Sequence, residues 1–291
     1  MRSFAGSGRW VSAGMLFVTV GGLGSPTWAA RRADDGDRPY WRTNLFKRVL
    51  TDQKFLVTRW WPHELEQPSF VTTLGFSVAM AIQSGSHADG GWDETLESGI
   101  SGAAGPGAKN VSHVLTAMGN GPAAAAVLGI AYLSSRRARD DRFSEVTSLA
   151  AESMLDAGIW IEALKAVAAR VRPDNPNASR FFQYGGSQSN SFPSGHAMGA
   201  FSVASVFAEY YRDTKWVPWV SYGAATLIGA SRRVLGRHFP SDVVVGALLG
   251  ASIGRGVVAR SGKEVPLARG TIGPVFGPEG RGIGVGWSYS W

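Results

Sequence analysis

Residues 231–242 read Ser-Arg-Arg-Val-Leu-Gly-Arg-His-Phe-Pro-Ser-Asp and bring together a cation (Arg232), an imidazole (His238) and a carboxylate (Asp242). Pro240 suits the first turn of a helix, because its missing N–H would have no partner there. Asp242 falls in the same turn, where the positive end of the helix dipole favours a carboxylate. His238 lies four residues upstream and within reach of Asp242. An imidazole oriented by a carboxylate beside an arginine suits nucleophilic attack on a bound anion, although a surface loop before a capped helix has the same composition.

Two more cations lie upstream, at Lys165 and Arg172. Apolar residues recur at helical spacing from 144 to 171, which predicts a long amphipathic helix over that range. Seven residues make two helical turns, so both cations are expected on about the same face. Pro173 would end the helix and fix the position of Arg172. A solvated basic face is the competing interpretation.

A third segment, Pro193-Ser194-Gly195-His196, directly precedes another predicted helix. Ser194 can cap that helix, and Gly195 allows close approach to the backbone, so the free N–H groups form an anion site. His196 falls in the first turn and is well placed to protonate a leaving group. Taken alone, the segment is also typical of a helix cap with an incidental histidine.

Together and in this order, the three segments resemble the signature of the type 2 phosphatidic acid phosphatase superfamily. This group includes bacterial class A acid phosphatases, lipid phosphate phosphatases and vanadium haloperoxidases. The resemblance rests on Lys165-x6-Arg172-Pro173, Pro193-Ser194-Gly195-His196 and Ser231-Arg232-x5-His238-x3-Asp242. These motifs span residues 165–242, and the remainder of the chain carries no part of them.

The resemblance implies a role for each signature residue. His238 would attack phosphorus to form a phosphohistidine, with Asp242 holding its ring in the right tautomer. His196 would act as general acid on the leaving oxygen and later as base for water. A hydroxyl, a backbone N–H and three cations would bind the phosphate oxygens and stabilise charge in the transition state, namely Ser194, Gly195, Lys165, Arg172 and Arg232. No metal and no cofactor is expected, because the cations supply the positive charge.

Composition favours a folded, mainly helical protein. The chain has 291 residues, of which 44% are hydrophobic and 18% are charged, and it has no cysteine, so disulfides and thiolate metal sites are excluded. We predict an all-α helical bundle of the phosphatase/haloperoxidase type, with helices at 70–82, 111–135 in two pieces, 144–171, 195–211, 216–229 and 241–259. The last helix carries Gly246, Gly250 and Gly254, a flat stripe that lets a neighbouring helix approach closely.

Two segments outside the motifs invite other predictions. Residues 84–107 are rich in Gly, Ser and Asp and are predicted to form a long loop, in which His87, Asp89, Asp93 and Glu94 are solvated rather than metal ligands. This loop could also act as a lid. At the C-terminal end, Ile283, Val285, Trp287, Tyr289 and Trp291 alternate with Gly and Ser, which predicts the second strand of a small β-hairpin whose turn falls in 274–282.

The N-terminal segment is typical of a secretory signal. Arg2 and Arg9 precede an apolar stretch over 10–23 that is short for a membrane span, and small residues follow at 27–30. We therefore predict a signal peptide (1–30), a helical and loop region (31–110), a catalytic bundle (111–259) and a tail with the hairpin (260–291). Removal of 1–30 lowers the net charge from +7 to +5. An uncleaved anchor is the alternative.

The leading hypothesis is an exported, metal-independent phosphatase of the periplasm or cell envelope. It would act on phosphate monoesters or diphosphates, either lipids such as phosphatidate or polyprenyl diphosphate or soluble compounds. The mean hydropathy of −0.03 favours a soluble protein or peripheral membrane contact over an integral enzyme. One alternative is a haloperoxidase with vanadate in the same pocket, and another is a non-enzymatic envelope protein. No nucleic-acid partner is expected.

Overall fold

The computed structural model describes residues 39–86, 91–175, 178, 180–186, 189–263, 265, 270–276 and 283–289. The predicted signal peptide, as well as His87 and Asp89 of the predicted loop, lies outside the described residues.

Short helices precede a bundle of longer ones. The first half contains η2 (Tyr40–Arg42), α1 (Leu45–Phe55), the π-helical η3 (Leu56–Trp60), α2 (Trp61–Glu64), α3 (Pro68–Ser86), α4 (Trp92–Ala103), α5 (Pro106–Met118) and α6 (Gly121–Ala138). The second half contains α7 (Asp141–Ala168), α8 (Gly195–Tyr210), α9 (Trp216–Val234), α10 (Pro240–Arg260), β1 (Gly270–Phe276) and β2 (Ile283–Tyr289).

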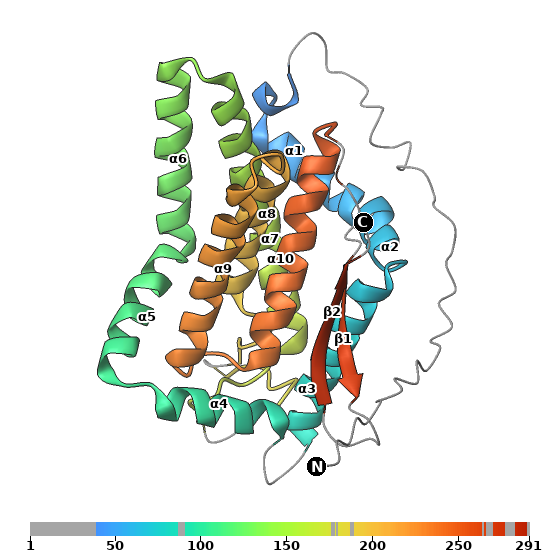
Figure 1. Ribbon diagram of the computed structural model, residues 1–291, viewed down its shortest axis with the longest axis vertical. Helices are drawn as coiled ribbons and strands as arrows, with labels where there is room; N and C mark the ends of the chain where they lie inside the picture. Colours follow the sequence, from blue (N-terminus) through green and yellow to red (C-terminus); the bar gives the residue numbers. More distant parts are fainter. Residues whose placement is uncertain are drawn as a thin grey trace, which may run out of the picture.

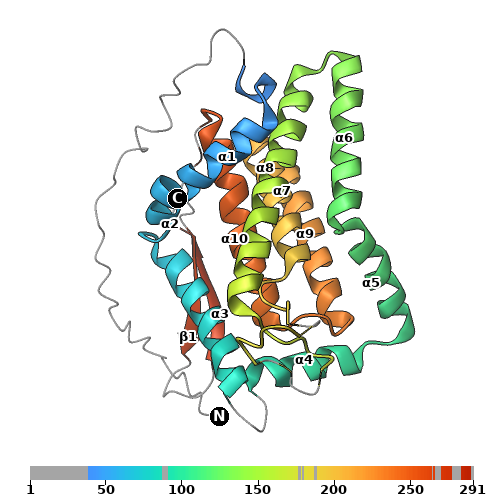
Figure 2. The same ribbon diagram turned by 180° about the vertical axis from the view of Figure 1, so that it is seen from behind.

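Helices α7 to α10 form the centre of the molecule and run alternately up and down (Figures 1 and 2). Helix α8 contacts α7, α9 and α10, while α6 packs on α7, α5 on α9 and α3 on α10. Helix α4 crosses the end of the bundle at which α8 and α10 begin (Figure 1). The predicted all-α bundle is therefore confirmed.

The glycine stripe of α10 brings α8 and α10 into close contact. A methyl group at Gly246 would overlap the carbonyl oxygen of Ser194, and one at Gly250 or Gly254 would overlap a backbone carbonyl one or two turns further along α8. Small residues at four-residue spacing leave such a groove for a neighbouring backbone. The stripe therefore fixes the start of α10 against the start of α8, where two of the motifs lie.

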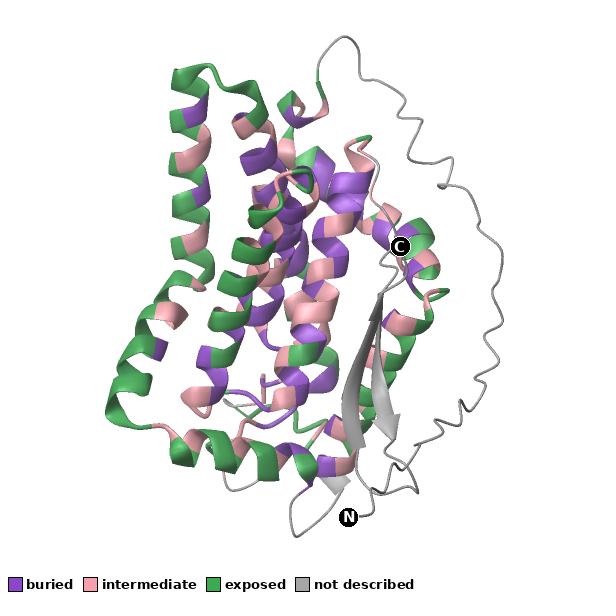
Figure 3. Cartoon of the chain, viewed as in Figure 1, coloured by how far each residue is buried: buried purple, intermediate pink, exposed green. Residues whose placement is uncertain are grey.

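The core lies where α7, α8 and α10 meet (Figure 3). Its buried apolar side chains include Val146 and Leu149 on α7, Val206 on α8 and Val257 on α10. Helices α5 and α6 instead expose most of their length (Figure 3).

The predicted loop over 84–107 is wrong. Helix α3 continues to Ser86, α4 covers Trp92–Ala103, and α5 begins at Pro106. The start of α4 is capped, because the Glu94 carboxylate accepts a hydrogen bond from Gly91 N at 2.9 Å. The glycines and serines here punctuate helices rather than form one long loop.

Two helix ends also differ from prediction. Helix α7 ends at Ala168, because Ala169 adopts the left-handed conformation with φ 39°. Arg172 therefore lies beyond the helix and does not share a helical face with Lys165. Helix α9 continues to Val234 rather than ending at 229, so Arg232 is helical.

Strands β1 and β2 pair antiparallel, with Gly270 opposite Tyr289 and Phe276 opposite Ile283. Pro274 lies within β1 rather than in the turn. Residues 277–282, which would join the strands, are outside the described residues, so the hairpin stays a prediction.

Candidate active site

Four helix ends bring the three sequence motifs together. The C-terminal ends of α7 and α9 meet the N-terminal ends of α8 and α10 at one end of the bundle (Figures 1 and 2). Because the central helices alternate in direction, motifs far apart in sequence share this end.

His238 is buried in the turn before α10, with 2% of its surface exposed. Its Nδ1 lies 2.8 Å from the backbone carbonyl oxygen of Ser191 and 3.7 Å from Oδ2 of Asp242. A carbonyl oxygen can only accept, so Nδ1 carries the hydrogen and Nε2 keeps its lone pair. The ring is therefore held mainly by Ser191, a partner that the sequence did not indicate, and only at longer range by Asp242.

Arg232 is fixed by the way α9 ends. Gly236 adopts φ 61°, and the N–H of Arg237 donates to the carbonyl oxygen of Arg232 at 2.9 Å. The N–H of Gly236 donates to the carbonyl oxygen of Arg233, which completes a Schellman motif. The guanidinium of Arg232 donates to the hydroxyl of Thr116 on α5 at 3.1 Å, and its buried Nε has no hydrogen-bond partner among the described residues.

Ser194 precedes α8 but does not cap it, contrary to prediction. Its backbone N–H donates to the carbonyl oxygen of Asp242 at 2.9 Å, which joins α8 to α10. Its hydroxyl is buried and makes no hydrogen bond within the described part of the chain. The side chain is therefore available to a ligand at the start of α8.

The remaining cations reach the same place from α7 and the segment after it. A methyl group at Gly195 would lie 3.6 Å from Nζ of Lys165, so this ammonium group borders the N-terminus of α8. The Nε of Arg172 donates to the Asn190 side chain at 2.7 Å. The prediction that Lys165 and Arg172 share a helical face was wrong, because α7 ends at Ala168. Both cations nevertheless lower the pKa of His196.

His196 is half-buried in the first turn of α8. Burial, followed by the charges of Arg232, His238, Lys165 and Arg172, lowers its pKa to about 4. The imidazole is therefore neutral at pH 7.

A comparison with protein families identifies the motif-bearing region. The model of the PAP2 superfamily matches residues 146–265. This match covers all three sequence motifs. The predicted resemblance is thereby confirmed.

Several curated proteins are similar over part of this chain. Lipid A 1-phosphatase of Porphyromonas gingivalis is 37% identical over 98 residues, which are 33% of this chain and 20% of the relative. Lipid A 1-phosphatase of Rhizobium johnstonii is 34% identical over 102 residues, or 33% and 39% of the two chains. Bacitracin transport permease protein BcrC of Bacillus licheniformis is 36% identical over 75 residues, or 26% and 34%. The chain thus spans between a fifth and two fifths of these relatives.

Two solved structures match part of this chain. The first transmembrane PAP2 type phosphatidylglycerolphosphate phosphatase from Bacillus subtilis is 24% identical, with a TM-score of 0.50 over 66% of this chain and 94% of the other. LpxE of Aquifex aeolicus is 23% identical, with a TM-score of 0.46 over 57% and 92%.

The cations at this end of the bundle lower one another's pKa values. Burial, followed by the charges of Arg172 and Arg237, lowers the pKa of Arg232 to about 10. Burial also lowers the pKa of Lys165, with Arg172 and Arg232 adding to the effect against the opposing charge of Glu162. Cations that disfavour one another's charge in this way are stabilised by a bound anion.

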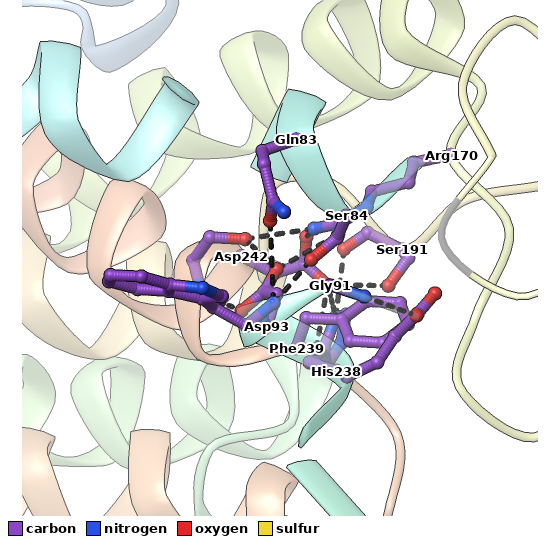
Figure 4. Close-up of polar contacts among 12 residues, drawn as sticks. Gln83, Ser84, Gly91, Asp93, Arg170, Ser191, His238, Phe239 and Asp242 are labelled. Carbon is purple, nitrogen blue, oxygen red and sulfur yellow. Dashed lines mark hydrogen bonds and ion pairs between the residues drawn. The ribbon is translucent and has the colours of Figure 1, made fainter. Parts of the chain in front are cut away.

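Sequence reasoning missed a buried network behind the PAP2 motifs (Figure 4). Arg170 is fully buried, and its guanidinium contacts Asp242 at 2.6 Å and Asp93 at 2.8 Å. Ser191 joins the network through its hydroxyl, which donates to Asp242 at 2.5 Å. An arginine at the end of an apolar helix was a weak signal for Arg170, and nothing in the sequence indicated that Asp93 packs beneath α10.

No group of three His, Cys, Asp or Glu side chains within the described residues is arranged to hold a metal ion. Asp93 and Glu94 were predicted to be solvated, but Asp93 is buried against Arg170 and the Glu94 carboxylate accepts a hydrogen bond from Gly91 N. Metal independence of the reaction stays a prediction.

Proposed function

We propose that this PAP2 chain is a metal-independent phosphatase that cleaves phosphate monoesters or diphosphates through a phosphohistidine on His238. The observation that carries the proposal is a cluster of cations with two donors that have no partner among the described residues, the Ser194 hydroxyl and Nε of Arg232. Buried polar groups are seldom left without a partner. A phosphate group held among Lys165, Arg172 and these two donors would satisfy both.

The first step is attack by Nε2 of His238 on phosphorus. Its lone pair is available because Nδ1–H donates to the carbonyl oxygen of Ser191. As the N–P bond forms, the bond from phosphorus to the leaving oxygen breaks, and His196 gives its proton to that oxygen. The cations and the N-terminus of α8 stabilise the charge on the phosphoryl oxygens.

The protonation of His196 is coupled to substrate binding. Its pKa of about 4 arises from burial and from the neighbouring cations. A phosphate dianion offsets those cations and raises the pKa, so His196 gains a proton as substrate binds. After it has protonated the leaving group, neutral His196 accepts a proton from water, which attacks phosphorus and releases His238.

We propose a phosphorylated lipid as the substrate. Two of the similar curated proteins are named lipid A 1-phosphatase. On α6, Val127, Ile130 and Leu133 are 66%, 66% and 62% exposed, and Trp219 on α9 is 81% exposed. Large exposed apolar surfaces of this kind suit contact with lipid. A membrane-associated enzyme of the cell envelope accounts for both observations.

By length and composition, α10 could cross a membrane, although 61% of its apolar window is buried in the protein. The bent pair α5 and α6, with 58° between the helices, passes the same test together. These helices support membrane association without fixing how the protein is inserted.

The test is phosphate release by the purified full chain in EDTA, from phosphatidate in mixed micelles and from a soluble aryl phosphate. We expect release to continue in EDTA, with phosphatidate preferred. His238→Ala should lower kcat by about 10⁴-fold or more, because the nucleophile is lost. His113→Ala is the matched control, since His113 is exposed on α5 and touches none of the pocket residues above.

Folding of each variant is checked by thermal unfolding. No release from either substrate by folded wild-type protein would contradict the proposal and favour the haloperoxidase or the non-enzymatic alternative. Equal release by wild type and His238→Ala would refute the nucleophile. Preference for the aryl phosphate would refute the lipid substrate alone.

A further inference from the structure

Asp93 lies outside the matched PAP2 region but is built into the catalytic end of the molecule. It is the second residue of α4, which crosses the end of the bundle at which α10 begins (Figure 1). Its side chain is completely buried and lies among Arg170, Asp242 and the start of α10 (Figure 4). A fully buried carboxylate requires partners, and here they come from the catalytic helices.

Both oxygens of Asp93 are bound. The Oδ1 atom accepts a hydrogen bond from the backbone N–H of Ser241 at 3.0 Å. The Oδ2 atom accepts from Nη2 of Arg170 at 2.8 Å and also from the Ser241 hydroxyl. Ser241 is the second residue of α10, so its N–H has no partner within the helix. Asp93 therefore caps α10 from a different helix.

Arg170 continues the chain of contacts towards the nucleophile. Its Nη1 donates to Oδ1 of Asp242 at 2.6 Å, and its backbone carbonyl oxygen accepts from the N–H of Ser191 at 2.9 Å. The guanidinium also lies 4.2 Å from the ring centre of Phe239, which limits its movement. Arg170 thus contacts Asp242 and Ser191, the two residues that face Nδ1 of His238.

We propose that Asp93 is a positioning residue for the phosphatase reaction, acting through Arg170 and Asp242 on His238. Two carboxylates share the charge of one arginine. When Asp93 is neutralised, Arg170 is attracted by Asp242 alone, and Asp242 stabilises positive charge on His238 less well. This inference rests on the proposed function, because it assigns His238 as the nucleophile.

The test compares Asp93→Asn with Ser84→Ala in the full chain, using phosphatidate in EDTA. We expect Asp93→Asn to lower kcat by about 10- to 100-fold, with KM changed less than about threefold. The acidic limb of the kcat/KM profile should move to lower pH, because loss of a negative charge lowers the pKa of His238 in the free enzyme.

Ser84→Ala is the structural control. The Ser84 hydroxyl accepts a hydrogen bond from the backbone N–H of Asp93 at 3.1 Å, so the variant loosens the same end of α4 without changing charge. It should lower the unfolding temperature while leaving kcat and the pH limb unchanged.

A double variant separates positioning from stability. If Asp93 acts through Asp242, Asp93→Asn should change kcat less than about threefold in an Asp242→Asn background. If Asp93→Asn does not fold, Ser241→Ala removes the hydroxyl shared by Asp93 and Arg170, and it should lower kcat by about three- to tenfold.

The outcomes are distinct. An inactive wild type refutes the proposed function. The positioning role is refuted if the wild type is active and folded Asp93→Asn keeps the same kcat and the same acidic limb of the pH profile. It is also refuted if folded Ser241→Ala keeps the wild-type kcat. The role is refuted as well if Asp93→Asn lowers kcat equally in the wild-type and the Asp242→Asn backgrounds.

Discussion

Two of the buried networks of carboxylates and arginines among the described residues differ in how their carboxyl groups ionise. Behind the active site, Arg170 lies between Asp93 and Asp242, at 2.8 and 2.6 Å. Between α1, α7 and the end of α10, Asp52, Glu152 and Asp156 gather with two arginines. In that second network, which we call the acid cluster, Arg48 lies 3.2 Å from Glu152 and Arg260 lies 2.8 Å from Asp52.

The pKa values of the carboxyl groups are shifted in opposite directions in the two networks. Burial opposes ionisation of Asp242, but the charge of Arg170, the nearby His238 and a hydrogen bond from the Ser191 hydroxyl outweigh it, so its pKa is held well below the usual range. In the acid cluster, burial followed by the charge of Asp52 raises the pKa of Asp156 to about 9.

Glu152 is shifted in the same direction, with burial and Asp52 raising its pKa well above the usual value. The difference shows that burial alone does not decide ionisation. Asp242, with Arg170 at 2.6 Å and donors from Ser191 and Phe239, stays charged, whereas Glu152 and Asp156 lie beside the Asp52 carboxylate and retain protons. A carboxylate that stays charged can stabilise positive charge on the proposed nucleophile. The acid cluster contains none of the motif residues.

The largest effect is expected from Arg170→Met. It leaves Asp93 and Asp242 buried without their cation, so we expect a loss of about 3–5 kcal/mol in the free energy of unfolding. Phosphate release should fall to the background level. Urea unfolding and activity assays measure the two effects.

Arg48→Met is the matched variant in the acid cluster. Its partner Glu152 can take a proton, so the expected loss of stability is smaller, at about 1–2 kcal/mol, and kcat of the folded enzyme should be unchanged. A larger loss for Arg48→Met than for Arg170→Met would contradict the difference drawn between the networks.

A smaller effect, of opposite sign, is expected from Asp156→Asn. Folded Asp156 keeps its proton up to about pH 9, whereas the unfolded chain releases it near 3.8, so this group makes the free energy of unfolding fall between those pH values. Asparagine removes the dependence. The variant should be more stable than wild type by about 1–2 kcal/mol at pH 8, with a smaller gain at pH 5.

Urea unfolding at both pH values checks this prediction. Asp141→Asn is a suitable control, because Asp141 is exposed at the start of α7 and its variant should show no gain at pH 8. Equal gains at pH 5 and pH 8 would argue against a retained proton on Asp156.

Features set by local chemistry could be predicted from the sequence. The helical class followed from apolar spacing, and the stripe from Gly246 to Gly254 indicated a close helix contact that α8 provides. The family resemblance supplied the motif residues, and their meeting at one end of the bundle follows from the alternating direction of the helices. The roles assigned to these residues stay predictions.

Features that depend on tertiary contacts could not be predicted. Arg172 was placed on a helix because seven residues match two turns, yet Ala169 ends α7 first. Ser194 has the residue type of a helix cap, but its buried hydroxyl has no hydrogen-bond partner among the described residues. Asp93 was assigned to a solvated loop because its neighbours are polar, and only the crossing of α4 beneath α10 explains its burial.

The central claim is that His238 carries the phosphoryl group during turnover. The most direct measurement is mass spectrometry of the His196→Ala variant, quenched in alkali after reaction with an aryl phosphate. This leaving group departs without an acid, whereas hydrolysis of the intermediate needs His196 as base, so the intermediate should accumulate. The account predicts a phosphoryl group on His238. The account would be contradicted if the His196→Ala variant released the aryl alcohol while His238 stayed unmodified and the wild-type enzyme turned over normally.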